Sequence, residues 1–341
     1  MSALITNPEF ELTGVWVSSD AKAGKDAAEL VGLADSTGVK ATKDLEAVLA
    51  AEPQCAVYTR MADNRLPEAL EDYRRILAAG VNVVGSGPVF LQYPYRVIPD
   101  EMLAPLEDAA RAGQSSLFVN GIDPGFTNDL LPLALTSTCQ SGQQVRCMEI
   151  MDYATYDDAT VMFDVMGFGK PIDELPMLLQ PGVLSLGWGS VVRQLAAGLC
   201  ISLDAVQEMY VREPAPEDFD IAAGHIPKGS AAALRFEVVG VVDGTPAVVL
   251  EHVTRLRGDL CPDWPQPAQP GGSYRIEITG EPSYAMDLCP SSRKGDHNHA
   301  ALVATAMRIV NAIPAVVAAP PGIRTTLDLP LVTGKGLYSA G

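Results

Sequence analysis

Short apolar runs alternate with amphipathic segments through the first third of the chain. Apolar runs typical of buried strands occur at residues 10–17, around 39, at 55–59, 81–85 and 116–119. Apolar spacing typical of helices occurs in the segments ending near 32 and at 43–51, 66–79 and 99–112. Because strands that alternate with helices are joined by right-handed crossovers, this pattern predicts a parallel sheet.

After residue 140 the pattern changes to long alternating strands. Residues 231–242 and 246–256 flank Asp243-Gly244, a pair that suits a tight hairpin turn. Further strands are expected at residues 145–153, 273–279 and 284–288, and an apolar helix at 299–313 that Pro314 interrupts. A mainly antiparallel sheet with helices on one face follows, and such a layer commonly supports dimerisation.

Together the two patterns predict an α/β protein of two domains. Residues 1–130 plus about 300–341 form a Rossmann-type parallel-sheet domain that binds a dinucleotide. Residues 131–299 form a second, mixed and mainly antiparallel α+β domain for substrate binding and dimerisation.

The chain is organised around residues 114–129, at the junction of these domains. Residues 116–119 form a buried strand, 120–125 a turn rich in Gly, Asp and Pro, and 126–135 an apolar helix. Such a turn after a parallel strand is where α/β enzymes place ligands. An ordinary connecting turn is the alternative interpretation.

The first strand and glycine-rich loop of a Rossmann domain are missing. Only nine residues precede the first strand, and no Gly-x-Gly-x-x-Gly stands between a strand and a helix. The strand at residues 10–17 therefore takes the second-strand position, and the phosphate cradle is not encoded. A gene model that begins too late would explain this.

Charge and cysteine content narrow the class of protein. A net charge of -18 with 24 Lys and Arg residues argues against a nucleic-acid surface. No signal-like segment or uninterrupted run of about 18 apolar residues is found, so no membrane contact and a cytoplasmic location are expected. The six cysteines lack a Cys-x-x-Cys pair, which indicates reduced, buried thiols.

Hydroxyl and ammonium groups follow the strand in the second position. Ser18, Ser19, Lys22 and Lys25 suit the 2′-phosphate of NADP better than the ribose of NAD, although NAD stays possible and Asp20 opposes a phosphate. The alternative is a solvated loop before a helix. Tyr58 and Thr59 end a later strand, where a nucleotide or substrate would lie. The alternative is that they are edge residues whose hydrogen-bonding groups are satisfied within the protein.

Several residues of the second half are candidates for the chemistry. Asp123, in the turn after residue 119, is a candidate proton acceptor or relay, or a plain turn residue. His225 precedes a strand and could face the substrate, or be a surface residue. Side chains that would line an apolar pocket, or equally form core, are Tyr153, Tyr156, Phe163, Met166 and Trp188. No metal site is expected, because beyond Asp296 no further candidate ligands cluster with His297 and His299.

With these residues in view, the chain resembles the dihydrodipicolinate reductase-like superfamily, in particular its 2,4-diaminopentanoate dehydrogenase and native amine dehydrogenase branch. The resemblance covers nearly the whole chain and depends on residues 121–126, 229–236, 261–265, 280–282 and 311–314. It implies a homodimer that transfers hydride between nicotinamide and an amine or imine carbon. It also places Gly121, Pro124, Gly125 and Asn311 on the nicotinamide side.

One departure from that family concerns the substrate. Amine dehydrogenases of the branch carry a glutamate after the strand matching residues 81–85, where this chain has Val89 and Phe90. A neutral carbonyl substrate is therefore expected before an amine. The sequence predicts an NADP-dependent oxidoreductase acting on a small carbonyl, imine or amine compound. The alternative is a non-catalytic ligand-binding or interaction protein that kept the fold and lost the phosphate loop.

Overall fold

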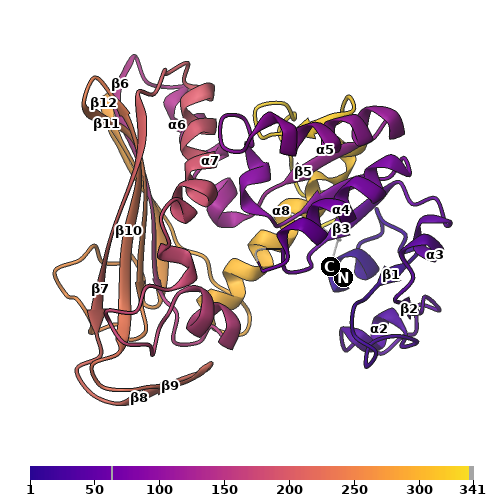
Figure 1. Cartoon of the computed structure of the whole chain (residues 1–341), viewed down its shortest axis with the longest axis horizontal. Coiled ribbons are helices and arrows are strands. Elements are labelled where there is room, and N and C mark those ends of the chain that lie inside the picture. Colours follow the sequence, from indigo (N-terminus) through magenta and orange to yellow (C-terminus); the bar gives the residue numbers. More distant parts are fainter. Residues whose placement is uncertain (63, 338–341) are drawn as a thin grey trace. The chain divides into compact units, whose positions relative to one another are not determined.

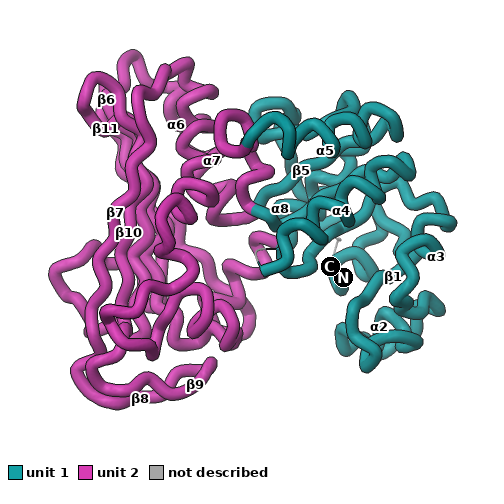
Figure 2. The backbone as a smooth tube through the Cα atoms, viewed as in Figure 1, with its two compact units in different colours: residues 1–88, 99–120, 306–341 teal, residues 89–98, 121–305 magenta. Residues whose placement is uncertain are grey.

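The computed structural model describes residues 1–62 and 64–337 (Figure 1). The chain folds into two compact units (Figure 2). Unit 1 comprises Met1–Pro88, Pro99–Asn120 and Ala306–Gly341, and unit 2 comprises Val89–Ile98 and Gly121–Thr305. The chain thus passes to unit 2 directly after Asn120, and returns to unit 1 within its last long helix.

Unit 1 contains a parallel sheet in two pieces. Four strands pair in the order β14-β5-β4-β3 and two more in the order β1-β2, all in parallel. These strands are β1 (Val15–Trp16), β2 (Ala41–Thr42), β3 (Cys55–Tyr58), β4 (Asn82–Gly85), β5 (Ser116–Val119) and β14 (Gly322–Arg324). In a Rossmann sheet the first strand lies between the second and the fourth. Among the described residues no strand lies between β1 and β3.

The helices of unit 1 lie close to their predicted positions. They are α1 (Ser2–Thr6), α2 (Ala27–Leu30), α3 (Leu45–Leu49), α4 (Leu66–Ala78) and α5 (Asp100–Gly113). The strand predicted at residues 10–17 is too long, because only Val15 and Trp16 pair with β2. Without a neighbour on its other edge, that segment has few backbone partners to extend its pairing.

The second half of one long helix, α8 (His297–Val317), contributes to the core of unit 1. Ile309, Ala312 and Val316 recur at helical spacing and are buried against Val84 of β4 and Phe118 of β5. By length and a mean hydropathy of 1.8, α8 could also cross a membrane. The predicted break at Pro314 is wrong, because apolar burial on both sides of it offsets the roughly 3 kcal/mol that a proline costs inside a helix.

Unit 2 is built on a mixed sheet of six strands in the order β13-β12-β6-β11-β10-β7 (Figure 1). The strands are β6 (Ser141–Asp152), β7 (Ala205–Pro214), β10 (Ala231–Val242), β11 (Thr245–Arg255), β12 (Gly272–Glu281) and β13 (Tyr284–Leu288). The predicted β10–β11 hairpin is confirmed, and β11 pairs with β6 in parallel. Strand β7 and the small hairpin of β8 (Phe219–Ile221) and β9 (Gly224–Ile226) were not predicted from the sequence.

Helices and single turns cover one face of this sheet. They are η1 (Val89–Gln92), η2 (Ile122–Phe126), α6 (Leu130–Thr136), η3 (Thr160–Val165), η4 (Met177–Leu179) and α7 (Val183–Gly198). Leu184, Val191 and Leu195 of α7 pack with Val238 and Leu250 in the main core of the unit. The helix predicted at residues 126–135 begins only at Leu130, where the Asp129 carboxylate accepts its first amide hydrogen.

All six cysteines are free thiols, but only Cys147 is buried. The expectation of buried thiols is therefore wrong for Cys200 and Cys289, which are exposed, and for the three others, which are half-buried.

Candidate active site

One row of side chains crosses the inner face of the sheet of unit 2. In the strand register His252 of β11 stands opposite Glu149 of β6 on one side and opposite Phe236 of β10 on the other. Tyr274 of β12 stands opposite Glu149 and extends the row. The neighbouring side chains on this face belong to the apolar core. Glu149 and His252 are therefore ionisable groups at positions where burial is costly unless they are paired.

Asp123 supplies the partner for His252 from the turn after β5. Oδ1 of Asp123 lies 3.0 Å from Nε2 of His252, and the two side chains are 3% and 6% exposed. The same oxygen accepts hydrogen bonds from the Asn128 amide at 2.7 Å and the Trp188 indole at 3.3 Å. Gly125 makes this turn possible, because its φ of 146° is a conformation that other residues rarely adopt.

Glu149 faces the other nitrogen of the same imidazole. Its Oε1 lies 3.7 Å from Nδ1 of His252, and the Tyr153 hydroxyl donates to that oxygen at 2.5 Å. Tyr153, Glu149, His252 and Asp123 therefore form a series of neighbouring ionisable groups, which we call the relay; the contact between Glu149 and His252 is an ion pair, longer than a hydrogen bond.

Burial and charge set the protonation of the relay near neutrality. Burial raises the pKa of Glu149 to about 7, against the attraction of His252, which acts to lower it. Burial acts to lower the pKa of His252, but the carboxylates of Asp123 and Glu149 outweigh it and the pKa is raised. Both groups thus favour holding a proton, and Glu149 can exchange one at physiological pH.

Aromatic rings enclose the imidazole of His252. Phe236 stacks on it with ring centroids 4.7 Å apart and planes 8° apart, and Trp188 of α7 meets it edge-on at 4.8 Å. The π-face of Phe236 favours a cationic imidazole, and both rings keep bulk water from it. The relay is therefore a shielded acid–base group.

Asp123, Glu149 and His252 are also a set of residue types that bind metals, with ligand atoms within 4.8 Å of one another. The imidazole lies between the carboxylates, and each carboxylate faces a different ring nitrogen. One ion binds only one nitrogen of an imidazole, so this arrangement suits proton exchange along the series better than coordination of a single ion.

The predicted NADP residues lie after β1 in unit 1. Ser18 and Lys22 are exposed, and no partner of the Lys22 side chain is found among the described residues. Ser19 accepts the Ala21 amide hydrogen, and Lys25 pairs with Glu29 at 3.1 Å. Asp20, which opposed a phosphate in the sequence analysis, pairs with Lys43 at 2.7 Å.

Two further predicted nucleotide residues end β3. The Tyr58 hydroxyl donates to Asp72 at 2.8 Å and accepts from Arg65 at 2.8 Å, while Thr59 is exposed. Burial and the neighbouring Asp72 raise the pKa of Tyr58 to about 12. The structure thus places Tyr58 as a satisfied buried residue and leaves Thr59 accessible.

The predicted nicotinamide residues are divided between the units. Gly121, Pro124 and Gly125 lie in the turn that carries Asp123, where the Pro124 carbonyl accepts a hydrogen bond from Gln92 at 2.6 Å. Asn311 is half-buried in the part of α8 that belongs to unit 1.

Most of the predicted pocket residues lie in or against the main core of unit 2. Phe90 is 3% exposed and Val89 is half-buried. Met166 belongs to that core, and Tyr156 and Phe163 pack against it. His225 lies apart from them on the exposed β8–β9 hairpin, 2.7 Å from Asp220.

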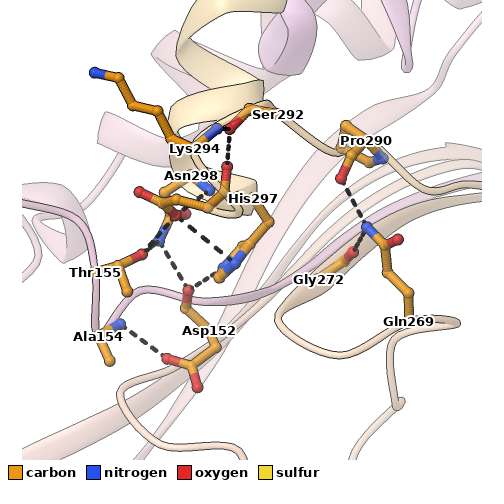
Figure 3. A network of polar contacts seen from close by, with 11 residues as sticks. Asp152, Ala154, Thr155, Gln269, Gly272, Pro290, Ser292, Lys294, His297 and Asn298 are labelled. Carbon is orange, nitrogen blue, oxygen red and sulfur yellow. Dashed lines mark hydrogen bonds and ion pairs between the residues drawn. The ribbon is translucent and has the colours of Figure 1, made fainter.

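His297 has a structural role at the start of α8. Its Nε2 lies 2.6 Å from the carbonyl oxygen of Asp152, which also accepts from the Asn298 amide at 3.0 Å (Figure 3). The Asn298 amide donates to Thr155 at 2.9 Å as well. This network fastens the end of β6, three residues after Glu149, to the first turn of α8.

Asp123 and Tyr153 were predicted from the sequence as candidate site residues, but Glu149 and His252 were not. A signal was present in the strand pattern. Glu149 stands in the apolar run Cys-Met-Glu-Ile-Met, and His252 occupies the inward position of a strand whose other inward residues include Val248 and Leu250. A lone ionisable residue at a core position of a strand indicates a functional or paired group.

Comparisons with known proteins place the chain in a family. Residues 126–336 match the 2,4-diaminopentanoate dehydrogenase C-terminal domain. The chain is 39% identical over 332 residues to an amine dehydrogenase of Streptomyces virginiae, covering 96% of this chain and 92% of that protein. It is 26% identical over 278 residues to a 2,4-diaminopentanoate dehydrogenase of Acetoanaerobium sticklandii, covering 79% and 72%.

A solved structure shares the fold. The amine dehydrogenase of Mycobacterium smegmatis superposes with a TM-score of 0.79 at 21% identity, over 99% of this chain and 94% of that one. The resemblance inferred from the sequence is thus confirmed, and so is the Rossmann-type architecture with a second, mostly antiparallel sheet. The chain belongs to the 2,4-diaminopentanoate dehydrogenase family and is an enzyme of the oxidoreductase class.

Proposed function

We propose that this enzyme is a nicotinamide-dependent dehydrogenase that interconverts a small amine and the corresponding carbonyl compound, with the relay as its acid–base group. The buried contact of Asp123 with His252, backed by Glu149, is the observation that carries this proposal. The names of the relatives, amine dehydrogenase and 2,4-diaminopentanoate dehydrogenase, support an amine as the substrate.

The reaction needs proton transfers that the relay can perform. Reductive amination joins a carbonyl compound and ammonia, loses water to form an imine, and consumes one hydride and one proton. When bound, the nicotinamide supplies that hydride. Glu149, with a pKa of about 7, and His252, whose pKa is raised, can hold the proton that the departing hydroxyl group needs and take it back in the reverse direction.

Asp123 supplies the negative charge that an iminium or ammonium group requires. Its Oδ1 is occupied by His252, Asn128 and Trp188, whereas no hydrogen bond of Oδ2 is found among the described residues. A cation buried without a counter-charge is costly. Asp123 therefore supplies the negative charge that a glutamate supplies in related amine dehydrogenases, at the position where this chain has Val89 and Phe90. An amine substrate is thus favoured over the neutral carbonyl compound expected from the sequence.

NADP remains the nucleotide that we favour over NAD. Support comes from the end of β1, where Ser18 and Lys22 are exposed and the opposing charge of Asp20 is paired with Lys43. A 2′-phosphate accepts hydrogen bonds from both residue types and gains from the ammonium charge.

The test is NADPH oxidation with a panel of small ketones and aldehydes, each with and without ammonium. The proposal predicts turnover that requires ammonium, and an amine product. Turnover of a ketone to its alcohol, unaffected by ammonium, would instead favour the neutral-carbonyl expectation. The same panel with NADH reports the nucleotide preference.

A further inference from the structure

Unit 2 has a pocket of about 350 Å³ on a face of α7 that the relay does not use. Leu186 and Arg193 line it from α7, and Arg96 lines it from the loop after η1. Leu186 and Arg193 are seven residues apart, about two helical turns, and so share one face. Trp188, which contacts Asp123, lies on a different face, so the pocket is separate from the relay.

Two arginines meet in this pocket without an acidic partner. Among the described residues neither Arg96 nor Arg193 makes an ion pair or a side-chain hydrogen bond, although the chain has 42 acidic residues. Burial lowers the pKa of Arg193, and the nearby charge of Arg96 lowers it further. Two guanidinium groups that repel each other in a half-enclosed space are stabilised by an anion between them.

The backbone around the pocket has two distinctive features, although the Arg96 side chain is exposed and that of Arg193 half-buried. Arg96 adopts a φ of 61°, a left-handed conformation uncommon for a residue with a side chain. The adjoining Gly182 and Ser185 amides donate to the Glu208 carboxylate at 2.7 and 2.9 Å, which fixes the first turn of α7. Glu208 is therefore engaged by the helix end, and the arginines remain available for a ligand.

We propose that the Arg96–Arg193 pocket binds a small organic oxyanion, a phosphate or a carboxylate, at a site distinct from the relay. The planar fork of a guanidinium matches both groups through paired hydrogen bonds. A water molecule occupies about 30 Å³ in the liquid, so the pocket of about 350 Å³ has room for more than a bare ion. Its volume also lies within the range of small-molecule binding sites. Val183 and Leu186 offer apolar surface to the rest of the ligand.

The test is calorimetric titration of the full chain with inorganic phosphate, glycerol phosphate and acetate, at constant ionic strength set with chloride. The chain should bind at least one of them saturably, and the ligand bound tightest distinguishes a phosphate site from a carboxylate site. The double variant R96Q/R193Q should bind it at least tenfold more weakly. The variant R293Q/K294Q, which loses two positive charges elsewhere in unit 2, should bind as the parent does.

Thermal unfolding gives an independent measurement on the same variants. The ligand should raise the melting temperature of the parent and of R293Q/K294Q, but not that of R96Q/R193Q. Failure of all three ligands to bind saturably, equal binding by R96Q/R193Q and the parent, or equal weakening in both double variants would overturn the proposal.

Discussion

Nε2 of His252 lies 3.0 Å from Oδ1 of Asp123, although the two residues are 129 positions apart in the sequence. His252 is fixed by the pairing of β11 with β6 and β10, and Asp123 by a turn that only Gly125 allows. Neither element alone creates the site. A paired strand and a glycine-dependent turn hold the imidazole and carboxylate together, as acid–base chemistry requires.

Glu149 should make the stability of the protein depend on pH. Its pKa is raised from 4.5 to about 7 on folding, so the folded state keeps a proton that the unfolded state releases between these values. Its contribution is therefore fully present below about pH 4.5 and lost as the pH rises through about 7. The raised pKa of His252 acts in the same direction at higher pH.

Between pH 5 and 8 the free energy of unfolding should fall less for the variant E149Q than for the parent. The difference between the two losses should be roughly 2–3 kcal/mol, as the size of the pKa shift of Glu149 implies. Urea unfolding at several pH values measures this. Parallel curves for the two proteins would show that Glu149 titrates normally in the folded state.

The loop after β1 should decide between the two nucleotides. Lys22 has no partner among the described residues, whereas Lys25 pairs with Glu29. A charge-assisted contact to phosphate is worth roughly 1.5–3 kcal/mol. The variant K22Q should therefore bind NADPH about tenfold more weakly and NADH unchanged, and K25Q should have a smaller effect.

Fluorescence titration with both nucleotides measures these affinities. K294Q, which removes a lysine charge in unit 2, is the matched control. Equal losses of NADPH and NADH affinity in K22Q would contradict the assignment of Lys22 to the 2′-phosphate.

The two positions that match the family glutamate should respond differently to a carboxylate. Phe90 is 3% exposed, so F90E buries a charge and removes a ring, at a cost of about 3–5 kcal/mol in stability. Val89 is half-buried, and V89E should fold and raise ammonium-dependent turnover. V89Q provides the uncharged control.

Melting temperatures and NADPH oxidation with ammonium distinguish these outcomes. If V89Q raised turnover as much as V89E, the gain would come from shape or polarity and not from the added charge.

The repeating patterns of the chain predicted most of the fold. Val83, Val84, Leu117 and Phe118 form runs buried on both faces, which is typical of a parallel sheet, and Asp243-Gly244 identified the long hairpin. The edge strand β7 was missed because its outward side chains, such as Met209 and Val211, are exposed despite being apolar. The helix break predicted at Pro314 was wrong because burial of Ile309 and Val316 outweighs the low helix propensity of proline.

The site was harder to predict because it depends on pairing between distant segments. Asp123 could be selected from its turn, but its partner could not, since strand register decides which β11 residue faces it. Glu149 and His252 become recognisable only once β6 and β11 are known to be neighbours in parallel. An inward-facing polar residue on each of two strands was the available signal.

The central claim is that the Asp123 carboxylate takes part in the reaction, and the variant D123N tests it most directly. Asparagine keeps the size and a hydrogen bond to His252 but removes the charge. Since a positioned acid–base group contributes about 10²–10⁴-fold, kcat for ammonium-dependent NADPH oxidation should fall about 100-fold or more, with NADPH affinity unchanged. D129N, which removes a buried carboxylate from the same segment, is the control. A D123N enzyme with the kcat of the parent, or a D129N enzyme impaired equally, would contradict the account.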